Sequence, residues 1–149
     1  MWYFLDTSAF VKRYKAEVGS ELVQRMFDEP AATLLTSAIT LAETYAALYR
    51  HSRKGRLPAE KLAEALDGVT VDLEGSRLHV LDVTSQHVAR SRHLIAEHEL
   101  TSHDALILSA AIDLKPFDAV FVCADVRSGL LHAAEACGLS TLNPLSPPR

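Results

Sequence analysis

The sequence of 149 residues has few of the features that mark several common classes of protein. Its two cysteines, Cys123 and Cys137, form neither a C-x-x-C motif nor a recognisable pair of metal ligands. We interpret both as free, buried thiols in a reducing compartment, because unpaired cysteine most often behaves as a small core residue. This pattern argues against a disulfide framework and against a cysteine-based metal site.

Long hydrophobic runs are also missing. The opening residues 1–5 are apolar but amount to one strand, and no positively charged segment followed by a long apolar run begins the chain. A membrane span requires about 20 apolar residues in succession, and no stretch approaches that length. We therefore expect a soluble, cytoplasmic protein that does not bind a membrane.

A positive net charge is missing as well. Nineteen Asp and Glu residues outnumber fifteen Lys and Arg residues, which gives a net charge of −4. Nucleic-acid-binding domains are typically basic, so any such surface here depends on local basic residues. The hydrophobic share of 48% is ordinary for a globular domain. Without repeats, low-complexity tracts or linkers, the chain is predicted to form a single domain, residues 1–149.

Short apolar runs alternate with helical patterns along the chain. The runs predict strands at residues 2–5, 33–36, 78–83, 119–123 and 140–142. Helices are predicted at residues 9–14, 21–28, 37–52, 59–67 and 84–99, from residue 101, and from the fourth strand to residue 137. Strands separated by helices favour a three-layer α/β/α sandwich around a central, mostly parallel sheet. The tail at residues 146–149 is expected to be loose.

Four acidic residues lie where a predicted strand ends or a predicted helix begins: Asp6, Glu43, Asp104 and Asp125. The carboxyl ends of parallel strands converge on one crevice, so these carboxylates are expected to share a pocket. Hard oxygen ligands without nearby Cys or His favour Mg²⁺ or Mn²⁺ over zinc. Such sites commonly act on phosphate esters, and the leading hypothesis is a small metal-dependent nuclease.

Each acid also has a purely structural interpretation. Asp6 and Asp125 are suited to cap the helices that follow them. Asp104 falls in a first turn, where the helix dipole favours an acid by about 0.3–1 kcal/mol. Glu43 matches a capping-box spacing, although a helix that begins at residue 37 would place it in the second turn. Capping preferences reproduce part of the pattern, so the residues alone leave both interpretations open.

Several neighbouring polar residues also have two interpretations. Thr7 and Ser8 either position a metal-bound water or cap a helix. Arg127 is expected in a first helical turn, where the dipole disfavours a cation, so it either binds a phosphate or partner carboxylate or makes a surface salt bridge. His103 is a proton shuttle or incidental. The basic run 50–56 either lines a nucleic-acid backbone or complements the C-terminus of a helix.

The segments that hold the acids are FLDTS at 4–8, LAE at 41–43, LTSHDALILSAA at 100–111 and FVCAD at 121–125. In order, spacing and context they resemble the PIN-domain ribonucleases, and in size and order the VapC-type toxins of bacterial and archaeal toxin–antitoxin modules. The resemblance spans nearly the whole chain. It implies a PIN-like fold in which Asp6, Glu43, Asp104 and Asp125 hold Mg²⁺ or Mn²⁺ for hydrolysis of RNA phosphodiester bonds by metal-activated water.

The resemblance further implies partners and shows one departure. It implies a small antitoxin protein that holds the toxin inactive, and a homodimer. The family usually carries Thr or Ser two residues before the last acid, where this chain has Cys123. A thiol is a poor hydrogen-bond donor, so the geometry of the site or its preference among metals is expected to differ.

Two other functions remain open. A strand followed by Asp-Thr-Ser resembles the nucleophile segment of haloacid-dehalogenase-like phosphatases, but that family expects an acid where this chain has Ser8. A non-catalytic PIN-like module that binds RNA or protein would keep the fold. Loss of an acid would favour that module, and here all four acids are present.

Overall fold

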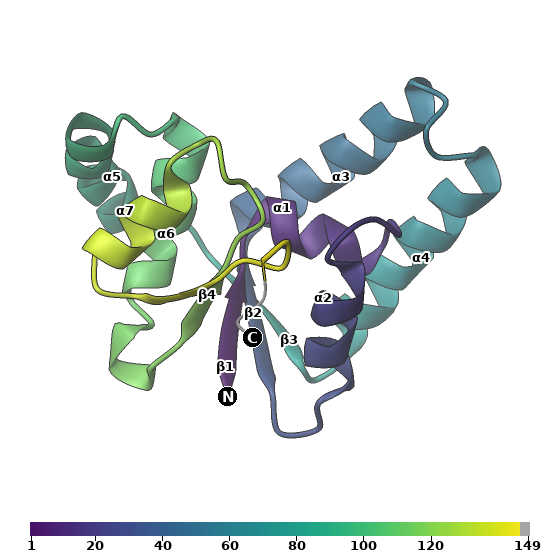
Figure 1. Cartoon of the computed structure of the whole chain (residues 1–149), viewed down its shortest axis with the longest axis horizontal. Coiled ribbons are helices and arrows are strands. Elements are labelled where there is room, and N and C mark those ends of the chain that lie inside the picture. Colours follow the sequence, from purple (N-terminus) through teal and green to yellow (C-terminus); the bar gives the residue numbers. More distant parts are fainter. Residues whose placement is uncertain (147–149) are drawn as a thin grey trace.

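A computed structural model of the chain describes residues 1–146 (Figure 1). Within these residues one sheet contains β1 (Trp2–Leu5), β2 (Thr33–Ser37), β3 (Leu78–Leu81), β4 (Val120–Val122) and β5 (Ser140–Leu142). The strand order is β3-β2-β1-β4-β5, and every neighbouring pair is parallel. The expected parallel sheet is confirmed. The expectation of a loose tail falls mainly on residues 147–149, outside the described residues.

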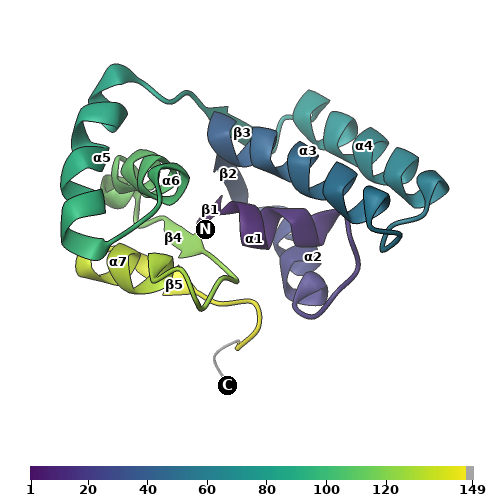
Figure 2. The ribbon, with the colours of Figure 1, turned by 90° about the horizontal axis from the view of Figure 1, so that it is seen from above.

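Helices cover both faces of the sheet. They are α1 (Thr7–Phe10), the 3₁₀ turn η1 (Val11–Arg13), α2 (Ser20–Asp28), α3 (Ala38–Arg53), α4 (Ala59–Glu74), α5 (Ser85–His98), α6 (Ser102–Ile112), the 3₁₀ turn η2 (Lys115–Phe117) and α7 (Leu130–Ala136). Seen from above, α5, α6 and α7 lie on one side of the sheet and α1 to α4 on the other (Figure 2). This is the three-layer α/β/α sandwich expected from the sequence. Within the described chain, no helix has the length and apolar character that a membrane span requires.

The central strands are apolar throughout because both of their faces are buried. Phe4 and Phe121 pack under α5, α6 and α7, whereas Leu5 and Val122, the next residues along, pack under α1 and α2. All four side chains are at most 1% exposed. Successive residues of a strand point to opposite faces, so a strand between two helical layers needs apolar residues at every position.

The strand order places a crevice beside β1. From β1 the chain moves outward to β2 and β3, and then returns to β4 on the other side of β1. At such a reversal the two connections leave in opposite directions, so the carboxyl ends of β1 and β4 mark the place where an α/β fold is expected to form a ligand-binding crevice. Asp6 follows β1 directly, and Asp125 follows β4 after two residues. The topology therefore brings together acids that are far apart in the sequence.

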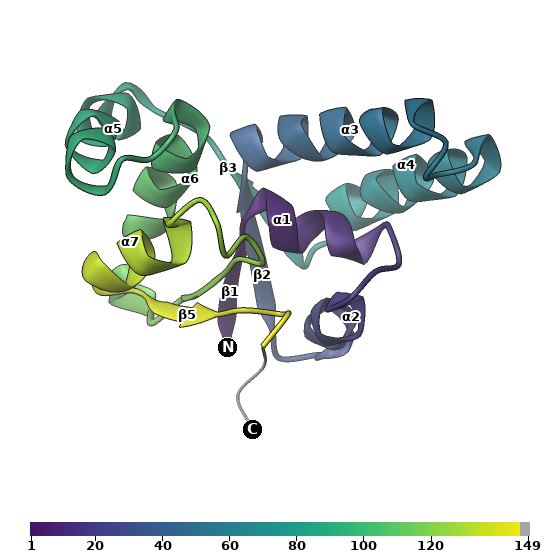
Figure 3. The same cartoon turned by 45° about the horizontal axis from the view of Figure 1, so that its top comes forward.

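Helices α3 and α4 form a hairpin that projects beyond the sheet (Figure 3). The sequence predicted that α4 ends near Asp67, but the helix continues to Glu74. Two contacts explain the extension: Val69 is fully buried against α3 and η1, and Gly68 lies under the ring of Tyr14. A Cβ at Gly68 would lie 3.3 Å from Tyr14 Cδ1. Packing across the hairpin thus outweighs the low helix propensity of glycine and the β-branched residues after it.

Candidate active site

Asp6 lies at the carboxyl end of β1 and begins α1. Its side chain is 3% exposed and acts as the N-cap, which confirms the capping interpretation. Ser8 donates two hydrogen bonds to the same oxygen, from its backbone N–H to Oδ2 at 3.2 Å and from its hydroxyl to Oδ2 at 2.6 Å. Ser8 thereby holds Oδ2 and leaves Oδ1 as the oxygen available to a ligand.

Asp125 lies across the crevice from Asp6, after β4. The backbone N–H of Asp6 donates to the carbonyl of Val122 at 2.9 Å, so the pairing of β1 with β4 continues to the edge of the site. Asp125 Oδ1 accepts the backbone N–H groups of Arg127 at 2.8 Å and of Ser128 at 3.3 Å. As in Asp6, one carboxylate oxygen is held by the protein.

The prediction that Arg127 lies in a first helical turn is wrong. The segment after Asp125 forms a bend, and α7 begins only at Leu130, with Gly129 as its N-cap at a φ of +76°. Asp125 makes the hydrogen bonds expected of an N-cap, but the backbone enters the left-handed region at Gly129 before a helical turn forms, so α7 begins after that residue. Arg127 is therefore an exposed loop residue next to Asp125, and the helix-dipole argument does not apply to it.

Glu43 reaches the site from the second turn of α3. The N-cap of α3 is Ser37, whose side chain accepts from the N–H of Thr40, so the capping-box interpretation of Glu43 is wrong. Glu43 Oε2 instead accepts a hydrogen bond of 2.6 Å from the hydroxyl of Thr7, which directly follows Asp6. A residue of α1 thus orients an acid of α3. Neither Thr7 nor Ser8 caps a helix with its side chain.

Asp104 lies in the first turn of α6, whose N-cap is Thr101. Burial raises the pKa of the Asp104 carboxyl group, a hydrogen bond from Thr101 acts in the opposite direction, and the negative charges of Glu43 and Asp125 raise the pKa further. This repulsion shows that α6, α3 and the segment after β4 bring their acids into electrostatic contact.

Burial also shifts the pKa of two other groups at this edge of the sheet, Asp6 and Cys123. It raises the pKa of Asp6, and the hydrogen bonds from Ser8 reduce the effect without reversing it. Burial and the nearby Asp6 carboxylate raise the pKa of the Cys123 thiol, which therefore stays protonated. The site thus combines a buried acid, three partly exposed acids and a neutral thiol.

The donor set suits a hard divalent cation. Asp6, Glu43 and Asp125 each have one oxygen held by a protein donor, which leaves the other for a ligand. Among residues 1–146, however, no three His, Cys, Asp or Glu side chains lie close enough together to hold a metal ion. The acids therefore have the oxygen chemistry that a divalent cation requires, and they lie at the same edge of the sheet. Binding a cation would require their side chains to move closer together.

The other candidate residues lie at or beyond the rim. His103 is 62% exposed, and its Nδ1 lies 3.6 Å from Glu43 Oε1. The basic run 50–56 begins near the end of α3, at the far tip of the hairpin (Figure 1). At a rise of about 1.5 Å per residue, Arg53 is roughly 15 Å along the helix from Glu43. The structure thus separates this run from the acids.

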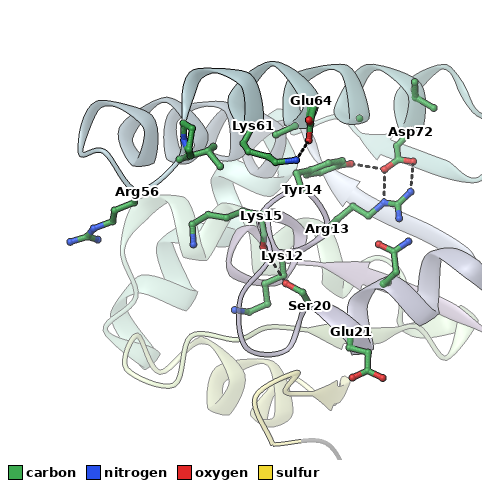
Figure 4. Close-up of a pocket in the computed structure, with 17 residues that line it drawn as sticks. Lys12, Arg13, Tyr14, Lys15, Ser20, Glu21, Arg56, Lys61, Glu64 and Asp72 are labelled. Atoms are coloured by element: carbon green, nitrogen blue, oxygen red, sulfur yellow. Dashed lines mark hydrogen bonds and ion pairs between the residues drawn. The ribbon is translucent and has the colours of Figure 1, made fainter.

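A large cleft lies elsewhere, between the α3–α4 hairpin and the segment that joins η1 to α2 (Figure 4). Its volume is about 850 Å³, and none of the four acids lines it. Its basic groups are mostly paired within the protein: Arg13 with Asp72, Lys61 with Glu64, and both Lys12 and Lys15 with Glu17. This cleft therefore stands apart from the acidic crevice in both position and charge.

The fold and the acidic edge define an α/β protein whose candidate chemistry lies at a reversal of strand order. Residues 3–116 match the family model of the PIN domain, and the chain belongs to the PIN-domain family. No curated protein matches it.

Solved structures similar to this chain include VapBC2 from Rickettsia felis bound to a promoter DNA fragment, with 21% identity, a TM-score of 0.64, and coverage of 96% of this chain and 98% of that chain. VapC20 from Mycobacterium tuberculosis, a sarcin–ricin loop cleaving toxin, has 16% identity, a TM-score of 0.65, and coverage of 98% and 99%. VapBC-1 from nontypeable Haemophilus influenzae has 20% identity, a TM-score of 0.58, and coverage of 98% and 100%. At these identities the likeness establishes the fold.

Proposed function

We propose that this protein is a metal-dependent endoribonuclease. The observation that carries the proposal is the arrangement of Asp6 and Asp125 on the two strands that border the crevice, with Glu43 and Asp104 entering from α3 and α6. Membership of the PIN-domain family and the similarity to a toxin that cleaves the sarcin–ricin loop support it.

The four acids would hold Mg²⁺ or Mn²⁺, with Asp6 and Asp104 as direct ligands and Asp125 direct or through water. Glu43 would ligate through water or orient the nucleophile. A cation bound there supplies activation of water and stabilisation of charge on the phosphodiester. The chain's own contribution is orientation: Ser8 and Thr7 fix the carboxylates of Asp6 and Glu43 before substrate arrives. Arg127 stands beside Asp125, exposed and able to meet a flanking phosphate.

Cleavage of total RNA by the purified protein, freed of any bound partner, tests the proposal. We expect discrete products with Mg²⁺ or Mn²⁺, none with EDTA, and none from Asp6→Asn or Asp104→Asn. Asp118→Asn is the matched control, because Asp118 is an exposed acid that precedes β4, at the opposite end of the sheet. Activity that survives EDTA, or that Asp118→Asn lowers as much as Asp6→Asn, would contradict the proposed site.

We further propose that the protein is the toxin of a type II toxin–antitoxin pair, with a small antitoxin as partner and a homodimer as its assembly. Support comes from the similar structures of a toxin–antitoxin complex from Klebsiella pneumoniae and of VapBC proteins from Rickettsia felis and Haemophilus influenzae. An RNA substrate would place its action in the cytoplasm. Expression of the wild-type chain alone should arrest bacterial growth, and Asp6→Asn should not. Sedimentation should give twice the mass of the 16.3 kDa chain.

A non-catalytic PIN-like module is the second candidate. It is favoured by the spacing of the acids, because no three of them within residues 1–146 lie at metal-binding distance. If folded protein bound neither Mg²⁺ nor Mn²⁺ and left tRNA, rRNA and mRNA uncut, this second function would replace the first.

A further inference from the structure

One hydroxyl group joins the two strands that border the acidic crevice. The Ser8 hydroxyl donates to Asp6 Oδ2 at 2.6 Å and accepts the backbone N–H of Ala124 at 2.8 Å. Asp6 follows β1, and Ala124 lies between β4 and Asp125. The oxygen of Ser8 therefore connects the acid on one side of the crevice to the backbone that carries the acid on the other side.

The thiol of Cys123 lies beside this connection and also makes a weak hydrogen bond to Asp6. Cys123 is fully buried, and its Sγ lies 3.6 Å from Ser8 Oγ and 3.8 Å from the carbonyl oxygen of Asp125. A thiol is a weak donor and acceptor, whereas a hydroxyl makes shorter and stronger hydrogen bonds. Besides the backbone bond from Asp6 to Val122, the strong hydrogen bonds that join the two segments here are consequently those of Ser8.

We propose that Ser8 is a positioning residue that fixes the Asp6 carboxylate relative to the backbone that carries Asp125 for cation binding. The proposal rests on the proposed metal-dependent function. Ser8 does not touch the cation or the substrate, because its hydroxyl is engaged by Asp6 and Ala124.

Removal of a group that orients a metal ligand typically lowers metal affinity about 10- to 100-fold. We expect that loss of Mn²⁺ affinity for Ser8→Ala in the full chain, measured by titration calorimetry, and near wild-type affinity for Ser8→Thr, which keeps the hydroxyl. Ser91→Ala is the matched control, because the Ser91 hydroxyl is also buried but donates to Val88 O within α5. Mn²⁺ affinity of Ser8→Ala within twofold of wild type would overturn the proposal.

Substitutions at Cys123 test the same idea independently of how well Ser8→Ala folds. Cys123→Ala should bind Mn²⁺ as the wild type does, and a tenfold loss would show that the thiol carries the positioning. Cys123→Thr should restore most of the affinity that Ser8→Ala loses, because it returns a hydroxyl to the same space. Failure of that rescue in a folded double variant would count against the shared role.

The wild-type titration separates this proposal from the proposed function. A wild-type chain that binds no Mn²⁺ overturns both. A wild-type chain that binds Mn²⁺ and cleaves RNA, together with a Ser8→Ala variant that binds equally well, overturns only the role of Ser8.

Discussion

Replacing Asp6 with Asn should stabilise the metal-free protein and, on the proposed function, abolish its activity. Asp6 is 3% exposed, and burial raises the pKa of its carboxyl group. A carboxyl group with a higher pKa in the folded state stabilises the fold below its unfolded pKa, and this contribution is lost as the pH rises through the folded pKa. As the pH rises above the unfolded pKa, the wild-type fold therefore loses stability through Asp6, and Asn, which does not ionise, avoids that loss.

The size of the effect follows from the linkage between pKa and stability. Because burial raises the folded pKa of Asp6, ionisation of Asp6 costs stability at pH 8, and each unit of such a shift is worth about 1.4 kcal/mol. The amide of Asn keeps an oxygen that accepts the hydrogen bonds from Ser8. For a chain of this size a gain of about 1 kcal/mol raises Tm by about 2–4 °C.

Asp72→Asn is the matched comparison, with the opposite expected sign. The Asp72 carboxylate is 13% exposed and accepts hydrogen bonds from Arg13 Nε at 2.9 Å, Arg13 Nη2 at 3.1 Å and the Tyr14 hydroxyl at 3.0 Å. Its neutralisation weakens charge-assisted hydrogen bonds and should lower the free energy of unfolding by about 1–3 kcal/mol.

Thermal unfolding in EDTA between pH 4 and pH 8 measures both effects. Asp6→Asn should unfold above the wild type at pH 8, and the difference should shrink toward pH 4, where a growing share of Asp6 is protonated in the unfolded chain as well. The reasoning is refuted if Asp6→Asn lowers Tm at pH 8, or if its effect on Tm is the same at both pH values.

Three further substitutions test other parts of the structure. Thr7→Val removes the hydrogen bond to Glu43 and should slow single-turnover RNA cleavage about tenfold at unchanged Tm; an unchanged rate would contradict that role. Val69→Ala should lower the free energy of unfolding in urea by about 1–3 kcal/mol, because Val69 is fully buried. A loss below about 0.5 kcal/mol, as is usual for substitutions at the surface, would refute the packing of α4. Burial acts to raise the pKa of the Asp113 carboxyl group, but hydrogen bonds from His87 and Arg90 outweigh this effect and lower the pKa. The resulting stabilisation is present above the unfolded pKa and is lost as the pH falls through the folded pKa. Asp113→Asn should therefore lower Tm at pH 7 more than at pH 3, and equal shifts would contradict the ion pair.

Local patterns were sufficient for the layers of the fold. Residues 2–5 and 119–123 are apolar at every position, which indicates burial on both faces, and the strands there are indeed covered on both sides. The strand order could not be predicted in this way, because it depends on which face of the sheet each crossover helix packs against, and no single segment encodes that choice. The sequence consequently predicted that the acids share an edge without indicating which two strands border the crevice.

The wrong boundaries have tertiary or side-chain causes. Gly68 is a poor helix former in isolation, and only the ring of Tyr14, more than fifty residues earlier, shows why α4 needs it. After β4, a helix was predicted immediately because Asp125 is a good N-cap. The carboxylate does accept the N–H groups of Arg127 and Ser128 as an N-cap would, but the chain bends and passes through Gly129 in the left-handed region before a helix begins. An Asp at the end of a strand favours both outcomes, and the propensity scales do not separate them.

The interpretations of Glu43 show what sequence reasoning about such a site requires. Its spacing from Thr40 fits a capping box, and nothing within the helix contradicts this. The partner that decides the question is Thr7, 36 residues away, whose hydroxyl takes Glu43 Oε2 at 2.6 Å. A capping acid interacts with its own helix, as Asp6 does with Ser8 of α1, whereas Glu43 is held by another element. The hydrogen bond from Thr7 restricts the Glu43 carboxylate without capping α3, and this is the pattern expected of a group kept for a ligand.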